Sequence, residues 1–317
     1  HDIAVVVGFA DVDGTHRYNA AAFAYNGDLI HVYHKMYLPN YGVFDEDRYF
    51  YRGNISPTYL LGTTSVAVNI CEDIWYPEGP TTFQANSGAN IIVNINASPF
   101  HVGKLDQRRS MLTERAANNK VHIVYVNMVG GQDELVFDGG SLVVDSKGEF
   151  IARGVQFEES LILIDLNIDS NEPKLPRAKD DVVSVLKKTH TPITKAYNQP
   201  TIDSKVKTKN AVIGPTSELD EIYKALVLGT KDYVHKIGFE KAVIALSGGI
   251  DSSLVAAIAV DALGGDNVTG VAMPSRFSSA SSLEDAVSLA ENLGIKLLVT
   301  SIEDSFKTLL NSLASHF

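Results

Sequence analysis

The stretch that most constrains the fold is an apolar run, residues 242–246 (AVIAL), followed by the string SGGIDSS at residues 247–253. Five consecutive apolar residues ending at Ser-Gly-Gly are typical of a buried strand, and residues 254–263 (LVAAIAVDAL) predict a helix packed on a sheet. The string is therefore a strand-to-helix turn. Such a turn directs backbone N–H groups and the positive end of a helix dipole at one place, where its glycines admit a ligand closely.

A phosphate group suits that place. Ser247, Ser252 and Ser253 add hydroxyl donors, and Asp251 at the helix start is placed to hold a phosphate-bound Mg²⁺ or to cap the helix. The string lacks the Gly-Lys-Ser/Thr ending of the Walker type. It resembles instead the pyrophosphatase-type loop of the ATP-dependent amidating and thiolating synthetases, which adenylate a substrate and release pyrophosphate.

Composition excludes several classes of function. The 27 Lys and Arg against 38 Asp and Glu give a net charge of −11, which argues against a nucleic-acid or membrane-surface protein. A single cysteine, Cys71, excludes an internal disulfide framework and favours a reducing, cytoplasmic compartment. We find no run of transmembrane length and no signal-peptide pattern.

The 317 residues predict about two domains. Residues 1–166 form the first, an α/β layer structure with a hairpin turn at Asn26-Gly27-Asp28 and helices at residues 79–86 and 104–118. Its strands are predicted at residues 3–9, 21–25, 29–33, 65–70, 91–95, 122–127, 141–144 and 161–164.

Residues 167–215 are polar, contain five prolines and have the composition of a linker. In residues 216–317 strands alternate with helices, which predicts a doubly wound, Rossmann-like parallel sheet with its ligand at the carboxyl ends of the strands. The chain opens directly on a strand-like run and stops soon after a helix. We interpret it as part of a longer polypeptide, truncated at both ends.

A second candidate site surrounds Cys71. It ends the predicted strand at residues 65–70 and is followed by Glu72 and Asp73. A lone cysteine is commonly a small buried hydrophobe, and neighbouring carboxylates disfavour a low thiol pKa unless a cation lies close. Lys35, at the end of another predicted strand, is the candidate cation, although a solvated surface lysine is the plainer interpretation.

The pattern around these residues resembles the nitrilase and amidase superfamily, in which a Glu, a Lys and a Cys hydrolyse a carbon–nitrogen bond within an α-β-β-α sandwich. It comprises a strand ending in Lys35, then YGVFDE at residues 41–46, CEDIW at 71–75 and NASPF at 96–100. Together with SGGIDSS, and with MPSR at residues 273–276, it resembles the glutamine-dependent NAD synthetase family over nearly the whole chain.

The resemblance implies that Cys71 is the glutaminase nucleophile, that Lys35 stabilises its thiolate and the oxyanion, and that Glu46 orients Lys35. It implies that glutamine is held by Tyr41, Ser98 and Lys104. The family's general-base glutamate should precede Lys35, but no glutamate precedes Glu46 in this sequence. This departure supports truncation rather than an altered mechanism.

For the second unit the resemblance implies that ammonia amidates deamido-NAD through an acyl-adenylate made from ATP, yielding NAD, AMP and pyrophosphate. It implies Mg²⁺ with Asp251 as a ligand, no tightly bound organic cofactor, and a homo-oligomer with small-molecule substrates. The residues it assigns to ATP are Ala245, Leu246, Ser247, Gly248, Gly249, Ile250, Asp251, Ser252, Ser253 and Arg276.

Two alternatives remain open at this point. Another pyrophosphatase-loop enzyme is one, although a tRNA-thiolating synthetase should show basic stripes or cysteine pairs and a GMP-forming one a Cys-His-Glu glutaminase. The other is a nucleotide-binding regulatory protein with an inactive glutaminase half.

Overall fold

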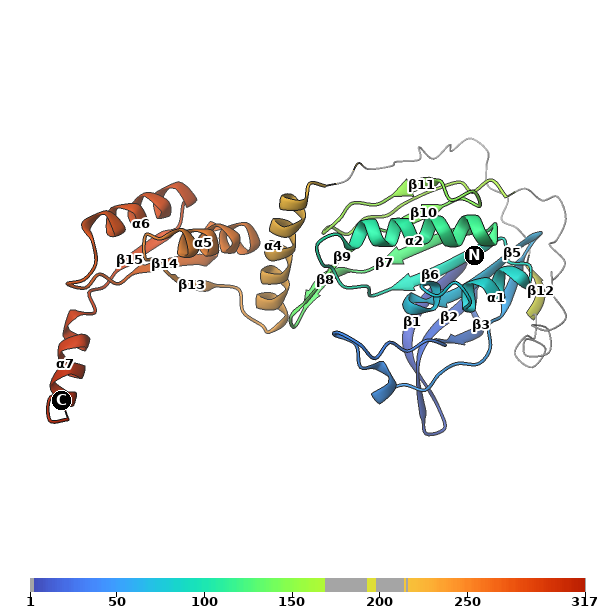
Figure 1. The fold of residues 1–317 in the computed structure, drawn as a ribbon, viewed down its shortest axis with the longest axis horizontal. Helices are drawn as coiled ribbons and strands as arrows, with labels where there is room; N and C mark the ends of the chain where they lie inside the picture. Colours follow the sequence, from blue (N-terminus) through green and yellow to red (C-terminus); the bar gives the residue numbers. More distant parts are fainter. Residues whose placement is uncertain (1–2, 169–192, 198–213, 215, 317) are drawn as a thin grey trace. The chain divides into compact units, whose positions relative to one another are not determined.

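The computed structural model describes residues 3–168, 193–197, 214 and 216–316, which fall into two compact units (Figure 1). The first holds His1–Val129 and Phe137–Thr216, and the second holds Gly130–Val136 and Ser217–Phe317. Most of the predicted linker at residues 167–215 lies outside the described residues. The boundaries predicted at 166 and 216 stay predictions.

The first unit contains a three-stranded antiparallel sheet of β1 (Ala4–Asp13), β2 (His16–Tyr25) and β3 (Asp28–His34). The predicted tight turn between β2 and β3 is confirmed, because Asn26 and Gly27 both adopt positive φ angles, of 55° and 91°. The hairpin delivers the end of β3, and with it Lys35, to the edge of the sheet.

A seven-stranded mixed sheet follows, in the order β11-β10-β7-β6-β5-β4-β12. Its central strands β5, β6 and β7 are parallel, so their carboxyl ends lie at one edge, where Cys71 and Asn96 are placed. The seven strands are β4 (Thr58–Leu61), β5 (Thr64–Ile70), β6 (Ile91–Asn96), β7 (His122–Asn127), β10 (Leu142–Val144), β11 (Phe150–Arg153) and β12 (Ile193–Tyr197).

Both faces of this sheet are packed as the nitrilase-like sandwich predicts, and the described residues of the first unit supply one of the two helical layers of the predicted α-β-β-α order. One face packs against α1 (Pro80–Asn86) and α2 (Lys104–Asn119) through a core that includes Leu112 and Ile123. The other packs against the β1–β3 sheet through Phe23 and Tyr33. The described residues thus form three layers, one helical and two of sheet.

Two predictions for this unit differ from the structure. Residues 161–164, predicted as a strand, form no strand, and the side chains of Leu161 and Leu163 are exposed because no neighbouring strand pairs with them. Strand β12 lies within the predicted linker and pairs in parallel with β4. Its five residues are too few to stand out from polar surroundings.

In the second unit three parallel strands, β13 (Ala242–Ala245), β14 (Val268–Ala272) and β15 (Lys296–Val299), form one sheet. Helices α5 (Ile250–Leu263), α6 (Ala280–Leu293) and α7 (Glu303–Leu313) follow the strands in turn. Helix α4 (Glu218–Lys236) precedes them and is capped by Ser217, whose hydroxyl accepts from the Asp220 N–H. The predicted alternation of strand and helix is confirmed.

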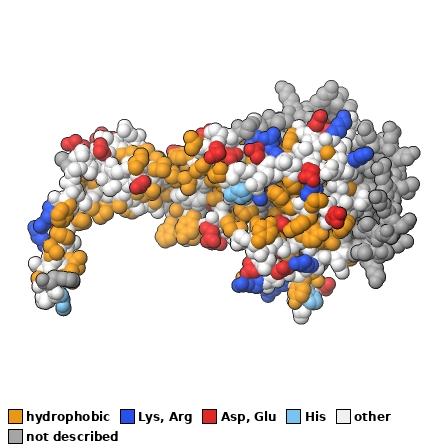
Figure 2. All heavy atoms as spheres, viewed as in Figure 1, with side chains coloured by type: hydrophobic (Ala, Val, Ile, Leu, Met, Phe, Trp, Pro, Cys, Tyr) orange, Lys and Arg blue, Asp and Glu red, His pale blue; other side chains and the backbone are white. Residues whose placement is uncertain are grey.

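The hairpin formed by β8 (Val129–Gln132) and β9 (Leu135–Asp138) was not predicted from the sequence. Residues Gly130–Val136 of this hairpin belong to the second unit, where the Gly131 N–H donates to Asp232 of α4 at 2.7 Å. On the face shown in Figure 2, Lys and Arg side chains are scattered rather than gathered in one patch. Among the described residues no helix is both long and apolar enough to cross a bilayer.

Candidate active site

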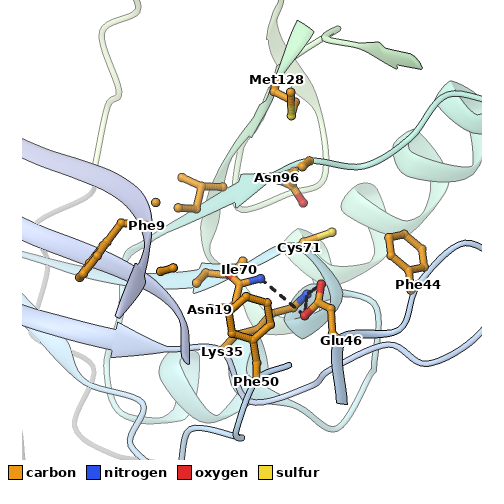
Figure 3. A pocket seen from close by; sticks show the side chains of 14 residues that line it. Phe9, Asn19, Lys35, Phe44, Glu46, Phe50, Ile70, Cys71, Asn96 and Met128 are labelled. Atoms are coloured by element: carbon orange, nitrogen blue, oxygen red, sulfur yellow. Dashed lines mark hydrogen bonds and ion pairs between the residues drawn. The ribbon is translucent and has the colours of Figure 1, made fainter. Parts of the chain in front are cut away.

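Cys71 occupies a strained turn at the carboxyl end of β5. It opens the short 3-10 helix η2 (Cys71–Ile74) with a φ of +43°, a conformation that is uncommon for a residue with a Cβ. Such backbone persists only where its surroundings hold it, and it is concentrated at active sites. The turn directs the Cys71 side chain into the pocket shown in Figure 3.

Lys35 and Glu46 lie in the same pocket and form an ion pair. The Lys35 Nζ donates to both carboxylate oxygens of Glu46, at 2.7 and 2.8 Å, and the Asn19 side-chain amide approaches the same carboxylate at 3.5 Å (Figure 3). The Lys35 side chain is only 1% exposed, so the surface interpretation of this lysine is wrong. The structure therefore brings together all three residues predicted to be catalytic.

The pocket has a volume of about 490 Å³, and apolar side chains form much of its wall. Glu46 is the one carboxylate among the described residues that line it. Such a cavity, apolar with a few convergent polar groups, is typical of a small-molecule site. Its apolar lining includes Phe9, Phe44, Phe50, Ile70, Ile95 and Met128.

Burial raises the pKa of the Cys71 thiol to about 11, and this effect outweighs the opposing influence of the Lys35 ammonium. The carboxylates of Glu72, Glu46 and Asp73 add to the rise. The sequence correctly predicted that these carboxylates disfavour a thiolate and that Lys35 opposes them. At neutral pH Cys71 is therefore a thiol, which would need a proton acceptor before it could act as a nucleophile.

Tyr41, predicted to hold glutamine, donates its hydroxyl to both carboxylate oxygens of Glu72 at 3.0 Å. Desolvation and this hydrogen bond raise the Tyr41 pKa. Glu72 is 5% exposed, and within the part of the chain that the structure describes its carboxylate accepts from a neutral hydroxyl rather than pairing with a cation. Glu72 therefore places a buried carboxylate next to Cys71 in the sequence, although it is not among the residues that line the pocket.

Ser98 and Lys104 also stay predictions. The Ser98 hydroxyl is turned inward, where it accepts from Arg108, whose guanidinium also pairs with the fully buried Asp138 at 2.8 Å. The Ser98 N–H donates to the Asn127 side chain, and the Ser98 carbonyl accepts from Arg108 and Asn127, so the polar groups of Ser98 are engaged within the protein. The Lys104 Nζ lies 4.3 Å from the centre of the Trp75 ring, and desolvation lowers the Lys104 pKa.

The SGGIDSS loop connects β13 to α5 as predicted. The Ser247 N–H donates to the Ser252 hydroxyl at 3.2 Å, and the Gly249 N–H donates to the Ser247 hydroxyl at 3.3 Å, which folds the loop onto the helix start. Gly248 has a φ of +77°, and a Cβ there would lie 2.2 Å from the Ser282 carbonyl oxygen. Only glycine fits, on both counts.

The other residues assigned to ATP are distributed around this loop. Leu246 is buried in the core of the second unit, and Ala245 ends β13. Ile250 and Asp251 open α5. Arg276 pairs with Glu303 of α7, so a nucleotide contact by Arg276 requires that this exposed ion pair open.

The model of the carbon–nitrogen hydrolase family matches residues 1–173, more than half of the chain. The chain belongs to the carbon–nitrogen hydrolase family. A second model, described as NAD synthase, matches residues 222–316, so this carbon–nitrogen hydrolase joins an NAD synthase region to its hydrolase region.

Similar proteins extend over both regions. A glutamine-dependent NAD(+) synthetase of Thermotoga maritima is 45% identical over 317 residues, covering 99% of this chain and 54% of that protein. That of Aquifex aeolicus is 44% identical over 98% of this chain and 54% of its own length. The solved structure of glutamine-dependent NAD+ synthetase from Acinetobacter baumannii, in complex with ADP, matches with a TM-score of 0.80 at 34% identity, over 99% of this chain and 53% of that one. The chain spans about half the length of the curated relatives it matches.

Sequence reasoning missed two polar residues of the hydrolase site. Asn19 reaches Glu46 from β2, 27 positions away in the sequence. Asp73 was recognised only as a carboxylate beside the thiol, whereas it accepts hydrogen bonds from residues 33–37 as well as from Ile70. Neither contact has a local sequence signature.

Proposed function

We propose that this carbon–nitrogen hydrolase is the glutamine-hydrolysing part of an NAD synthetase. The observation that carries the proposal is the convergence of Cys71, Lys35 and Glu46 in one pocket, on a chain that also carries the SGGIDSS loop. The names of the relatives and the NAD synthase match at residues 222–316 support the same assignment.

At the first site, the deprotonated Cys71 sulfur attacks the side-chain amide carbon of glutamine. The carbon–nitrogen bond breaks, and ammonia leaves after its nitrogen gains a proton. Water then hydrolyses the thioester, releases glutamate and restores the thiol. The Lys35 ammonium, held in place by Glu46, stabilises the negative charge that develops on the amide oxygen.

Glu72 supplies the selectivity for an amino acid in this proposal. Its buried carboxylate follows the nucleophile directly and is bonded by the Tyr41 hydroxyl. An α-ammonium group is the complementary charge for such a carboxylate, and a charge-assisted hydrogen bond there would repay the cost of burying it. Lys104, close enough to Trp75 to stack on its ring, is assigned to the α-carboxylate.

At the second site, the N–H groups of the SGGIDSS loop and the start of α5 bind the ATP phosphates. Asp251 is a single exposed carboxylate, and the described residues contain no cluster of three metal-ligating side chains. This fits Mg²⁺, which is commonly held through one or two carboxylates and the phosphates themselves. When bound, the ion supplies charge neutralisation at the phosphates.

The product side of the proposal is the amidation of deamido-NAD through an acyl-adenylate, by a cytoplasmic homo-oligomer. The test measures NAD formation by the full-length protein from deamido-NAD, ATP and Mg²⁺, with glutamine or with ammonium. Cys71→Ala should abolish the glutamine reaction and retain the ammonium reaction. Wild-type protein that makes NAD from neither nitrogen source would refute the assignment.

A further inference from the structure

Asp73 connects two segments that build the hydrolase site, residues 33–37 and the end of β5. One carboxylate oxygen accepts from the backbone N–H groups of Met36 and Tyr37, at 3.1 and 2.8 Å. The other accepts from the Ile70 N–H at 3.0 Å and from the Tyr33 hydroxyl at 2.8 Å. The carboxylate is fully buried.

Two of the four donors are adjacent to a residue that takes part in the proposed chemistry. Met36 directly follows Lys35, and Ile70 directly precedes Cys71. The two segments are far apart in sequence and belong to different sheets, β3 to the three-stranded sheet and β5 to the seven-stranded one. Asp73 therefore fixes the backbone that carries the cation relative to the backbone that carries the nucleophile.

The hydrogen bonds of Asp73 also help to hold the strained backbone of Cys71. A residue with a φ of +43° needs surrounding contacts that hold it. The Ile70 N–H bond to Asp73 closes the turn around Cys71 from one side. From the other side, the Arg115 guanidinium donates to the carbonyls of Ile74 and Trp75, at 3.1 and 2.7 Å.

We propose that Asp73 is a positioning residue that sets the separation of Lys35 from Cys71, and that the rate of thioester formation depends on it. The inference rests on the proposed glutamine hydrolysis and deepens it. Asp73 does not line the pocket, so it acts through the two groups that it places and through the charge that adds to the rise of the Cys71 pKa.

Asp73→Asn is the informative change, because asparagine has the same shape and lacks one acceptor. With its NH₂ toward Met36 and Tyr37, two backbone N–H groups would face a donor. With its NH₂ toward Ile70, only the Ile70 N–H would face a donor, because the Tyr33 hydroxyl can rotate to accept a hydrogen bond. The second arrangement is therefore favoured, and it releases the turn at Cys71 while keeping the Lys35 segment in place.

The experiment compares glutamine hydrolysis by full-length wild type, Asp73→Asn and Asp73→Glu. Because misplacing reacting groups by about 1 Å can cost about 100-fold, we expect kcat to fall by about 10- to 100-fold in both variants. The KM for glutamine should change less than about threefold, since Asp73 does not line the pocket. Asp73→Glu keeps the charge and moves it, so its recovery of full kcat would overturn the proposal.

A matched control separates positioning from stability. Thr81→Val removes a buried hydrogen bond from Asn69, on the same strand β5, without touching the Lys35 segment. If Thr81→Val loses as much stability as Asp73→Asn, its kcat should still stay within about threefold of wild type. A fall in kcat as large as that of Asp73→Asn would show that Asp73 acts through stability alone. If Asp73→Asn does not fold, Tyr33→Phe removes one donor and should lower kcat two- to fivefold with KM unchanged; an unchanged kcat would overturn the proposal.

Thiol alkylation tests the same inference without glutamine. Neutralising the ion pair with Lys35→Met/Glu46→Gln should change the pH profile of Cys71 alkylation by iodoacetamide when Asp73 is present. The same neutralisation should change it much less in the Asp73→Asn background. Equal changes in both backgrounds would refute the positioning role, whereas a wild type that is alkylated normally but does not hydrolyse glutamine would refute the proposed function.

Discussion

The Lys35–Glu46 pair makes the most demanding prediction about the hydrolase site. Lys35→Met keeps the aliphatic stem but leaves the Glu46 carboxylate without its cation, and Glu46→Gln leaves the ammonium without its anion. Breaking a buried ion pair from one side costs about 3–5 kcal/mol. The Lys35 side chain is 1% exposed and that of Glu46 is 19% exposed. We therefore expect Lys35→Met near the lower end of that range and Glu46→Gln near the upper end.

The double variant should recover most of the loss, because it removes both charges and retains similar volumes. Its free energy of unfolding should lie within about 1–2 kcal/mol of wild type, which gives a coupling energy of several kcal/mol between the two positions. Glutamine hydrolysis should be lost in Lys35→Met and in the double variant alike, since the oxyanion then lacks its cation.

The assay is denaturant unfolding followed by tryptophan fluorescence. The sequence contains one tryptophan, Trp75, which packs against the core of the first unit, so its signal reports on the unit that holds the ion pair. Single-variant losses that simply add in the double variant, with a coupling energy below about 0.5 kcal/mol, would refute the view that the pair is buried and mutually dependent.

Three further predictions concern single residues. Burial raises the Cys71 pKa to about 11, so the rate of Cys71 alkylation should keep rising from pH 9 to 11. Because the thiol ionises at a lower pH in the unfolded chain, the free energy of unfolding should fall over the same range. An alkylation rate that reaches a plateau near pH 8.5 would contradict this. Gly248→Ala should weaken ATP binding more than about tenfold in an equilibrium titration, because its Cβ would meet the Ser282 carbonyl at 2.2 Å, while glutamine hydrolysis continues. Arg108→Met should lower stability by about 3–5 kcal/mol in the same fluorescence assay, because it leaves Asp138 buried without its cation, and a loss under 1 kcal/mol would count against that pair.

Local sequence patterns were sufficient for most of the elements. The apolar run before Ser247 and the Asn26-Gly27 turn have physical signatures within a few residues, and the structure confirms both. The same holds for the helix predicted at residues 104–118, which the structure extends by one residue as Lys104–Asn119. The family resemblance, and not the spacing of residues, predicted that Lys35, Glu46 and Cys71 lie in one site.

Contacts between distant segments could not be predicted from the sequence. Asp73 bonds Tyr33, Met36 and Tyr37 across 36 to 40 positions, and nothing in the local sequence distinguishes it from a solvated carboxylate. Strand β12 was not predicted for the same reason, because its pairing with β4 rather than its composition makes it a strand. The Arg276–Glu303 pair likewise depends on how α7 packs.

The electrostatics of the pocket indicate what the hydrolase reaction still requires. Both oxygens of Glu46 accept from Lys35, so this carboxylate is engaged and serves poorly as a base for the thiol. It also offsets the lysine's charge, which leaves burial to dominate and keeps Cys71 protonated. The resemblance places the general-base glutamate upstream of Lys35, and residues 1–34 contain no glutamate. We therefore expect this chain of 317 residues to hydrolyse glutamine slowly at neutral pH, and fast hydrolysis would show that Glu46 itself accepts the proton.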